Sequence, residues 1–179
     1  LFFHIWIPIF EYSDVSLEIF IKRIGYCGVD IFLLLSGIGL TFSIKKSSLK
    51  EFYYKRIKRI LIPTLVIAVM NGATYNWDII YFIKNVFGYN FFAVNIYSFL
   101  WFIQAIVIFY AIFPFYYKVF LKAKNKCFFT LAFILAVSFV TIIFQSVIRE
   151  DLYGFTNRIP IFVTGVLCGW LMQYKEINN

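Results

Sequence analysis

Residues 28–63 read GVDIFLLLSGIGLTFSIKKSSLKEFYYKRIKRILIP, and this stretch decides the fold. An apolar segment, broken by one acid near its start and a Ser-Gly pair, leads into seven Lys and Arg within residues 45–59, and a second apolar segment follows. An apolar run of about twenty residues is long enough to cross a bilayer, and cationic residues between two such runs are typical of a cytoplasmic turn. The stretch therefore predicts a transmembrane hairpin with a basic turn.

The composition of the whole chain agrees with a membrane protein. Hydrophobic residues make up 62% of the 179 residues and charged residues only 15%, whereas a soluble domain is about half apolar. The net charge of +8 comes from Lys and Arg in short connectors between apolar runs, so we interpret it as an orientation signal and expect no nucleic-acid partner. The three cysteines are far apart and have no neighbouring histidine, which argues against a metal site and a disulfide framework.

Six apolar runs predict a single all-α domain over residues 1–179, built as a polytopic transmembrane helical bundle. The expected spans are 1–10, 26–44, 60–75, 98–117, 127–148 and 159–174. Because the first residues are already apolar, we expect a fragment that begins within its first helix.

The connectors between these spans carry further predictions. Residues 11–27 are expected to form a loop with one interfacial turn or short helix, and residues 76–97 an interfacial excursion. Residues 45–59 are expected to form an amphipathic helix that leads into the third span, with Pro63 in the first turn of that span.

The distribution of Lys and Arg predicts the orientation. Residues 45–59 hold seven of these cations, residues 118–126 hold four and the tail after 174 holds one, against five in the connectors on the other side. The positive-inside rule then makes the turns 45–59 and 118–126 cytoplasmic. His4 and Asp30 are expected toward the outer half, and Arg56 and Arg59 at the inner face.

Polar residues within or beside the spans are the candidate functional residues. His4 is the one histidine, and Pro8 leaves its carbonyl without a helical donor; the alternative is a histidine that merely caps its own helix. Ser36 and Gly37 indicate either close helix packing or a ligand that approaches the backbone. Asp30 indicates either a functional acid or a carboxylate near the start of the second helix.

Arg56 and Arg59, three residues apart, lie on one side of the basic helix and suit a phosphate. The alternative is a plain orientation signal that touches lipid headgroups. Gly165 and Gly169 have the spacing that lets helices approach closely, and Gln104 is the one strongly polar side chain of the fourth span.

Four segments in order resemble the acyltransferase 3 family of membrane acyltransferases: GVDIFLLLSG, YYKRIKRILIP with its RxxR, LWFI and RIPIFVTGVLCG. The resemblance covers essentially the whole chain. It implies a domain of about ten helices in a bacterial-type inner membrane, lacking here both ends and an arginine upstream of the histidine. It also implies O-acetylation of polysaccharide, in which acyl-CoA is a co-substrate, no other cofactor is needed, and an acyl group, commonly acetyl, moves to a hydroxyl of a sugar or cell-surface glycan.

The resemblance places His4 where the family has its catalytic histidine, and a neutral histidine suits the removal of a hydroxyl proton near pH 7. Asp30 is expected to orient His4 or the acceptor hydroxyl. Arg56 and Arg59 are expected to hold the donor phosphates, with Ser36 and Gly37 along the path of the thioester. The residues expected at the outer mouth, toward the carbohydrate acceptor, are Arg158, Gln104 and Trp101, although Arg158 also fits a snorkelling surface residue.

Two rival functions use the same features differently. A transporter or flippase of a glycan or lipid precursor would recruit its anionic substrate with the cationic face, but predicts an internal repeat that the two unequal basic turns do not show. A scaffold without catalysis would need neither the histidine nor the arginine pair. The sequence favours an acyltransferase that transfers groups other than aminoacyl groups.

Overall fold

The computed structural model describes residues 15–74, 101–143 and 155–178, with positions 80, 83, 84 and 89 between them. Within these residues the chain is all-helical, in five long helices. Their bounds are α2 Val15–Lys45, α3 Leu49–Thr74, α6 Trp101–Lys122, α7 Lys126–Ile143 and α9 Ile159–Asn178. The predicted first span, residues 1–10, and most of residues 76–97 lie outside the described part.

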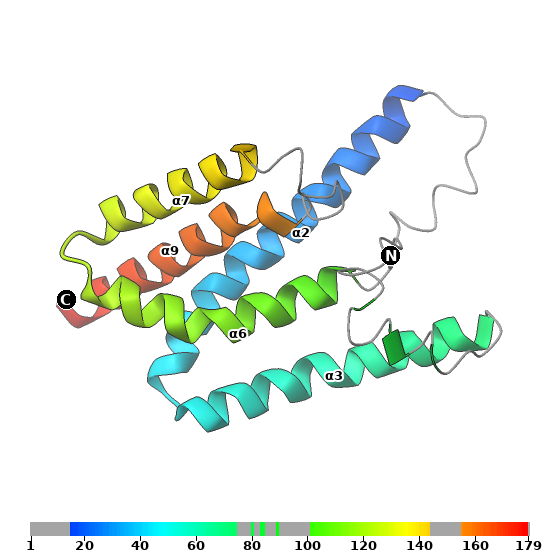
Figure 1. Cartoon of the computed structure of the whole chain (residues 1–179), viewed down its shortest axis with the longest axis horizontal. Helices are drawn as coiled ribbons and strands as arrows, with labels where there is room; N and C mark the ends of the chain where they lie inside the picture. The colour runs from blue at the N-terminus through cyan, green and yellow to red at the C-terminus, as the bar shows by residue number, and fades with distance from the viewer. Residues whose placement is uncertain are drawn as a thin grey trace.

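The five helices are stacked side by side, and each runs opposite to the described helix before it (Figure 1). The turns from α2 to α3 and from α6 to α7 lie at the same end, where α9 also finishes (Figure 1). The two predicted basic turns and the C-terminal Lys175 therefore gather at one end of the molecule. As a further consequence, α2 and α9 run in the same direction.

Three helices are long and apolar enough to cross a membrane: Cys27–Lys45 within α2, Phe102–Lys122 within α6, and Lys126–Ile143. These segments confirm the second, fourth and fifth predicted spans to within a few residues. The third and sixth predicted spans are helical, as α3 and α9, but they are not among the candidate spans found in the described residues. The described part thus shows an all-α protein with three candidate spans.

Two local predictions were wrong. The loop expected over residues 11–27 is helical from Val15 onward, because apolar positions at helical spacing continue into the span without a proline to end the helix. Pro63 lies well inside α3 and not in a first turn, because the amphipathic helix and the span after it are one continuous helix. The helix continues past the proline, and the Thr64 hydroxyl donates to the Ile60 carbonyl at 2.7 Å.

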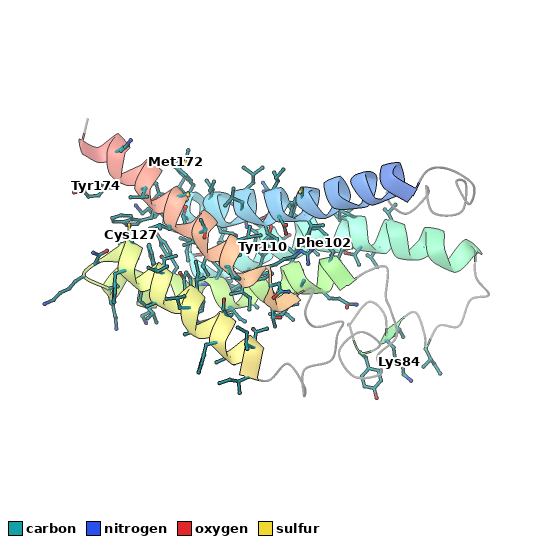
Figure 2. The ribbon with its side chains drawn as sticks, turned by 90° about the horizontal axis from the view of Figure 1, so that it is seen from above. Lys84, Phe102, Tyr110, Cys127, Met172 and Tyr174 are labelled. Carbon is teal, nitrogen blue, oxygen red and sulfur yellow. The ribbon has the colours of Figure 1, made fainter. Side chains whose placement is uncertain are left out.

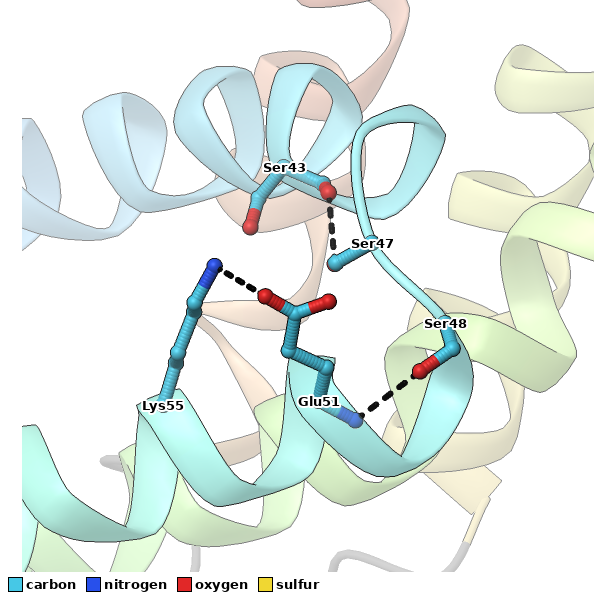
Figure 3. A network of polar contacts seen from close by, with 5 residues as sticks. All are labelled: Ser43, Ser47, Ser48, Glu51 and Lys55. Carbon is cyan, nitrogen blue, oxygen red and sulfur yellow. Dashed lines mark hydrogen bonds and ion pairs between the residues drawn. The ribbon is translucent and has the colours of Figure 1, made fainter.

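Two serines close the short turn between α2 and α3, and an ion pair follows within α3 (Figure 3). The Ser47 hydroxyl donates to the Ser43 carbonyl at 2.9 Å, which closes the end of α2. The Ser48 hydroxyl accepts from the Glu51 amide at 3.3 Å and caps α3. Glu51 also pairs with Lys55 at 2.6 Å on the exposed side of α3. This pairing lowers the pKa of the Glu51 carboxyl.

Glycines bring α2 and α9 into backbone contact. A Cβ added at Gly37 would lie 2.5 Å from the Phe162 carbonyl oxygen and 2.9 Å from the Val166 nitrogen. A Cβ at Gly165 would meet the Leu34 carbonyl, and one at Gly169 would meet the Thr41 hydroxyl. The prediction that Gly165 and Gly169 permit a close approach is therefore confirmed, with α2 as the partner helix.

Aromatic side chains fill the space between α6 and its neighbours. Phe113 is fully buried at the centre, where its ring stacks on Phe52 of α3 at 5.9 Å and meets the edge of Phe162 of α9 at 6.3 Å. Phe109 stacks on the same Phe162 at 4.7 Å. The core therefore positions α3 and α9 on two sides of α6.

Candidate functional site

A cavity of about 650 Å³ opens between α2, α3 and α6. It brings together three of the four residues predicted to bind the donor, Ser36 from α2 and Arg56 and Arg59 from α3. The remaining lining residues are Phe32, Leu35, Gly39, Ile60, Pro63, Thr64, Ile103, Ile106 and Tyr110. The two cations share this cavity with two hydroxyls, a phenol and an otherwise apolar wall.

The lining residues follow each helix along the bundle. On α3 the lining extends from Arg56 to Thr64, which at 1.5 Å per residue is about 12 Å. On α6 it extends from Tyr110 back to Ile103, about 10 Å by the same rise. The arginines therefore mark the end nearest the basic turn, and apolar side chains surround the cavity toward the opposite end.

Arg56 is a desolvated cation held by aromatic rings. Its guanidinium carbon lies 5.5 Å from the centre of the Phe52 ring and 5.7 Å from that of the Tyr110 ring. Burial lowers the pKa of Arg56 below its ordinary value; Tyr110 opposes this shift and the positive charge of Arg59 adds to it. Within the described residues its buried Nε has no hydrogen-bond partner. An anion in the cavity would offset the burial of this charge and satisfy that nitrogen.

Tyr110 joins the three walls of the cavity. Its hydroxyl donates to the Ser36 hydroxyl on α2 at 3.4 Å, a long hydrogen bond, while its ring faces Arg56 of α3. Figure 2 shows Tyr110 on α6 between Phe102 and the end of the bundle that carries Cys127. Because one side chain touches both opposite walls, Tyr110 fixes their separation at the level of Arg56.

Gly37 faces away from this cavity. The structure places it against Phe162 and Val166 of α9, in the helix contact described above, and it is Gly39 that lines the cavity wall. The two residues of the Ser-Gly pair therefore point to different neighbours, because consecutive positions on a helix are about 100° apart. A role of Gly37 in donor binding stays a prediction.

Asp30 and Arg158 form an ion pair between α2 and α9. The Asp30 Oδ1 lies 3.3 Å from the Arg158 Nε, with the arginine side chain 10% exposed and the carboxylate 37% exposed. The Arg158 carbonyl accepts from the Phe162 amide at 3.2 Å, so this arginine stands at the start of α9. A cation is disfavoured there by the helix dipole, and the carboxylate offsets that cost.

This ion pair corrects two alternatives drawn from the sequence. Asp30 is not a carboxylate near the start of its helix, because α2 begins fifteen residues earlier at Val15. Arg158 is not a snorkelling surface residue, because it is buried against Asp30. The two residues, both expected on the acceptor side but in separate roles, are paired with each other.

The remaining predicted residues are Gln104, Trp101 and His4. Gln104 is buried in α6, one position from Ile103 of the cavity wall. Trp101 is the first residue of α6. His4 falls outside the described residues, so its catalytic role stays a prediction.

The sequence reasoning missed Tyr110 and Phe52, the two aromatic residues beside Arg56. Tyr110 follows Ile103 and Ile106 at the i, i+3, i+7 spacing of one helix face, and this periodicity could have assigned it to the same wall. Phe52 lies four residues before Arg56, on the same face of α3, and this spacing is also readable.

Comparison with known proteins places the chain in a family. The sequence model of the acyltransferase 3 family, described as an acyltransferase domain, matches residues 1–175. No match was found among curated proteins or among solved structures. With nearly the whole sequence matched and membrane-length helices around a cationic cavity, the chain belongs to the acyltransferase 3 family and is a membrane acyltransferase.

Proposed function

We propose that this acyltransferase transfers an acetyl group from acetyl-CoA at the cytoplasmic face to a hydroxyl of a sugar or cell-surface glycan. One observation carries the proposal: Arg56 and Arg59 line a single cavity that extends from the basic end of the bundle between three helices. Coenzyme A presents several phosphates, and guanidinium groups bind such oxyanions with paired, charge-assisted hydrogen bonds. The basic end is cytoplasmic by the positive-inside rule, and this is the side where coenzyme A is found.

The cavity suits the rest of the donor as well. Besides the arginines it offers Ser36 and Thr64 among apolar side chains, over about 10 Å of helix rise. A pantetheine arm alternates amide groups with short apolar stretches, so it fits a narrow channel with few polar contacts. The thioester then lies toward the outer half of the bundle, away from the bound phosphates.

The reaction needs a base for the acceptor. In the proposed step the acceptor hydroxyl oxygen attacks the thioester carbonyl carbon while the His4 imidazole takes the hydroxyl proton. The carbon–sulfur bond then breaks, and the coenzyme A thiolate leaves and takes up a proton. The products are the acyl ester and coenzyme A, and His4 is neutral again once it has released its proton.

The ion pair at the opposite end from the basic turns supplies polar groups on the acceptor side. Asp30 keeps part of its carboxylate exposed while bound to Arg158. We place the sugar hydroxyl near this carboxylate, with Gln104 and Trp101 at the same end of α6. The complete arrangement is a membrane bundle with six spans in this chain and about ten in the full domain, in a bacterial-type inner membrane.

Acetyl transfer by membranes that carry the full-length protein tests the proposal. Membranes receive labelled acetyl-CoA and surface glycan, and label in the glycan is measured for wild type, His4→Ala, Arg56→Ala and Lys58→Ala. We expect His4→Ala to lower the rate about 10²- to 10⁴-fold, the range for loss of a general base. Normal label transfer by His4→Ala would refute the mechanism.

Lys58→Ala is the matched control for the arginine. Lys58 is an exposed cation on the same turn of α3 but does not line the cavity. Both variants lose one positive charge, so both weaken orientation and lipid contacts equally. If Arg56 binds the donor, only Arg56→Ala raises the KM for acetyl-CoA. An equal effect of the two variants would mean that the basic segment serves orientation alone.

A further inference from the structure

The guanidinium carbon of Arg56 lies over two aromatic rings, and its buried Nε has no hydrogen-bond partner within the described residues. Phe52 and Tyr110 lie 5.5 and 5.7 Å from its central carbon, at the distances of cation–π contacts. Phe52 is fully buried and packs on Phe113, so its ring is fixed by the core. The N–H groups of a guanidinium point outward in its plane, so the unpartnered Nε–H is available to a ligand.

Aromatic rings beside the guanidinium reduce the entropy that the arginine side chain loses when it binds a ligand. A free arginine side chain loses about 2 kcal/mol of rotamer entropy when a ligand fixes it. Aromatic contacts that hold it before the ligand arrives reduce this cost, which is the general advantage of preorganisation. Arg59, by contrast, is exposed and has no ring contact within the described residues.

We propose that Tyr110 is a positioning residue for the donor: its ring, oriented by the hydrogen bond to Ser36, sets Arg56 for edge-on binding of a donor phosphate. The inference rests on the proposed function, in which Arg56 binds coenzyme A. Helix α6 then takes part in donor binding through Tyr110, although the two cations that bind the donor both come from α3.

The ring and the hydroxyl of Tyr110 contribute differently. The hydrogen bond to Ser36 is long, at 3.4 Å, so its loss has a small effect. A partly desolvated cation–π contact is worth about 1 to 2 kcal/mol, which corresponds to a factor of roughly 5 to 30 in affinity. Tyr110→Phe is therefore expected to keep coenzyme A binding within about twofold, and Tyr110→Leu to weaken it about tenfold.

Phe109→Leu controls for a loss of packing. Phe109 precedes Tyr110 on α6 and is buried, but its ring stacks on Phe162 of α9 and does not line the cavity. Both substitutions remove an aromatic ring from the same helix. A merely structural role of Tyr110 predicts the same change in Kd from both variants, whereas the positioning role predicts a change from Tyr110→Leu alone.

The experiment measures the Kd of coenzyme A for the full-length protein in nanodiscs, by calorimetry, in a double-mutant cycle of Tyr110→Leu and Arg56→Ala. Because Tyr110 acts through Arg56, Tyr110→Leu should have no further effect once Arg56 is alanine. The KM for acetyl-CoA should follow the Kd, while kcat stays within about twofold of wild type. Nanodiscs of zwitterionic lipid, compared with nanodiscs that contain anionic lipid, separate donor phosphate from lipid headgroup as the ligand.

The outcomes separate this inference from the proposed function. An unchanged Kd in Arg56→Ala overturns the donor site and, with it, the role of Tyr110. If Arg56→Ala weakens coenzyme A binding but Tyr110→Leu weakens it further in the Arg56→Ala background, the role of Tyr110 alone is overturned. If anionic lipid abolishes coenzyme A binding in wild type but not in Arg56→Ala, the arginine binds headgroups and both are overturned.

A second variant series avoids any change of shape. Phenylalanine at position 110 can carry one, two or three ring fluorines, which weaken the negative potential of the ring face and leave its packing nearly unchanged. The Kd of coenzyme A should rise stepwise with fluorination. A Kd that is constant across the series overturns the positioning role even if Tyr110→Leu does not fold.

Discussion

Gly165→Ala tests the backbone contact between α2 and α9. The new methyl group would meet the Leu34 carbonyl oxygen, with the carbonyl carbon at 3.0 Å and Cα at 3.1 Å. These are backbone atoms and cannot rotate away as a side chain does. The two helices must therefore separate until the contacts approach the usual 3.5 to 4.0 Å, a shift of about 1 Å at this point.

The shift has a predictable cost. A gap of about 0.5 to 1 Å removes a quarter to a half of each dispersion contact along the interface, and overpacking of a close contact typically costs about 1 to 3 kcal/mol. Alanine is the better helix former by about 1 kcal/mol, which offsets part of this loss. We expect Gly165→Ala to lower the free energy of unfolding by about 1 to 2 kcal/mol.

Gly28→Ala is the matched control, since a Cβ at this position of α2 meets nothing within 4 Å. It gains the helix propensity without the clash and should raise stability by up to about 1 kcal/mol. Unfolding of the full-length protein in detergent, followed by circular dichroism during heating, measures the difference. Equal midpoints for Gly165→Ala and Gly28→Ala would show that the helices do not meet through Gly165.

Two further predictions concern charge and capping. Asp30→Asn leaves the Arg158 charge without its counter-charge, and because Asp30 is partly exposed we expect the free energy of unfolding to fall by about 1 to 2 kcal/mol. The double variant Asp30→Asn, Arg158→Leu should recover most of this loss. Thermal unfolding of both variants measures the difference. If the double variant is less stable than Asp30→Asn, the pair is not what makes the single change costly. Ser48→Ala should cost about 1 kcal/mol through loss of the α3 cap, whereas Ser47→Ala, whose hydroxyl bonds only a carbonyl at the end of α2, should cost less. Similar midpoints for the two serine variants would contradict the cap.

Local features of the fold were readable from the sequence. The hairpin of residues 28–63 is present as α2, a short serine turn and α3, and its basic residues lie at one end of the bundle as their spacing predicts. Helix ends were less predictable, as the extension of α2 to Val15 illustrates. An apolar run indicates the part of a helix that can lie in the membrane, but the helix itself extends for as long as its backbone groups form i to i−4 hydrogen bonds.

Partner choice across the chain was not readable. Gly37, Gly165 and Gly169 indicate close packing by their size, but nothing in a single sequence says that they pack on each other. The same holds for Asp30 and Arg158, which are far apart along the chain and were assigned separate roles. Such pairings depend on how the helices pack against one another, and the periodicity of apolar residues within one helix does not specify its partner helix.

In the cavity, the type of residue was predictable and the orientation was not. The spacing of Arg56 and Arg59 indicated a shared face, and both line the cavity. Their difference in environment comes from Phe52 and Tyr110, and only the second of these belongs to another helix. A donor-binding role for both arginines is still a prediction.

The pairing of α2 with α9 has a consequence for biogenesis. Gly37 and Gly165 are separated by roughly 130 residues, so at 5 to 20 residues per second the ribosome needs about 6 to 26 seconds between them. During that interval α3, α6 and α7 are synthesised while the glycine face of α2 is not yet covered by α9. The contact between α2 and α9 therefore forms only after every other described helix has been made.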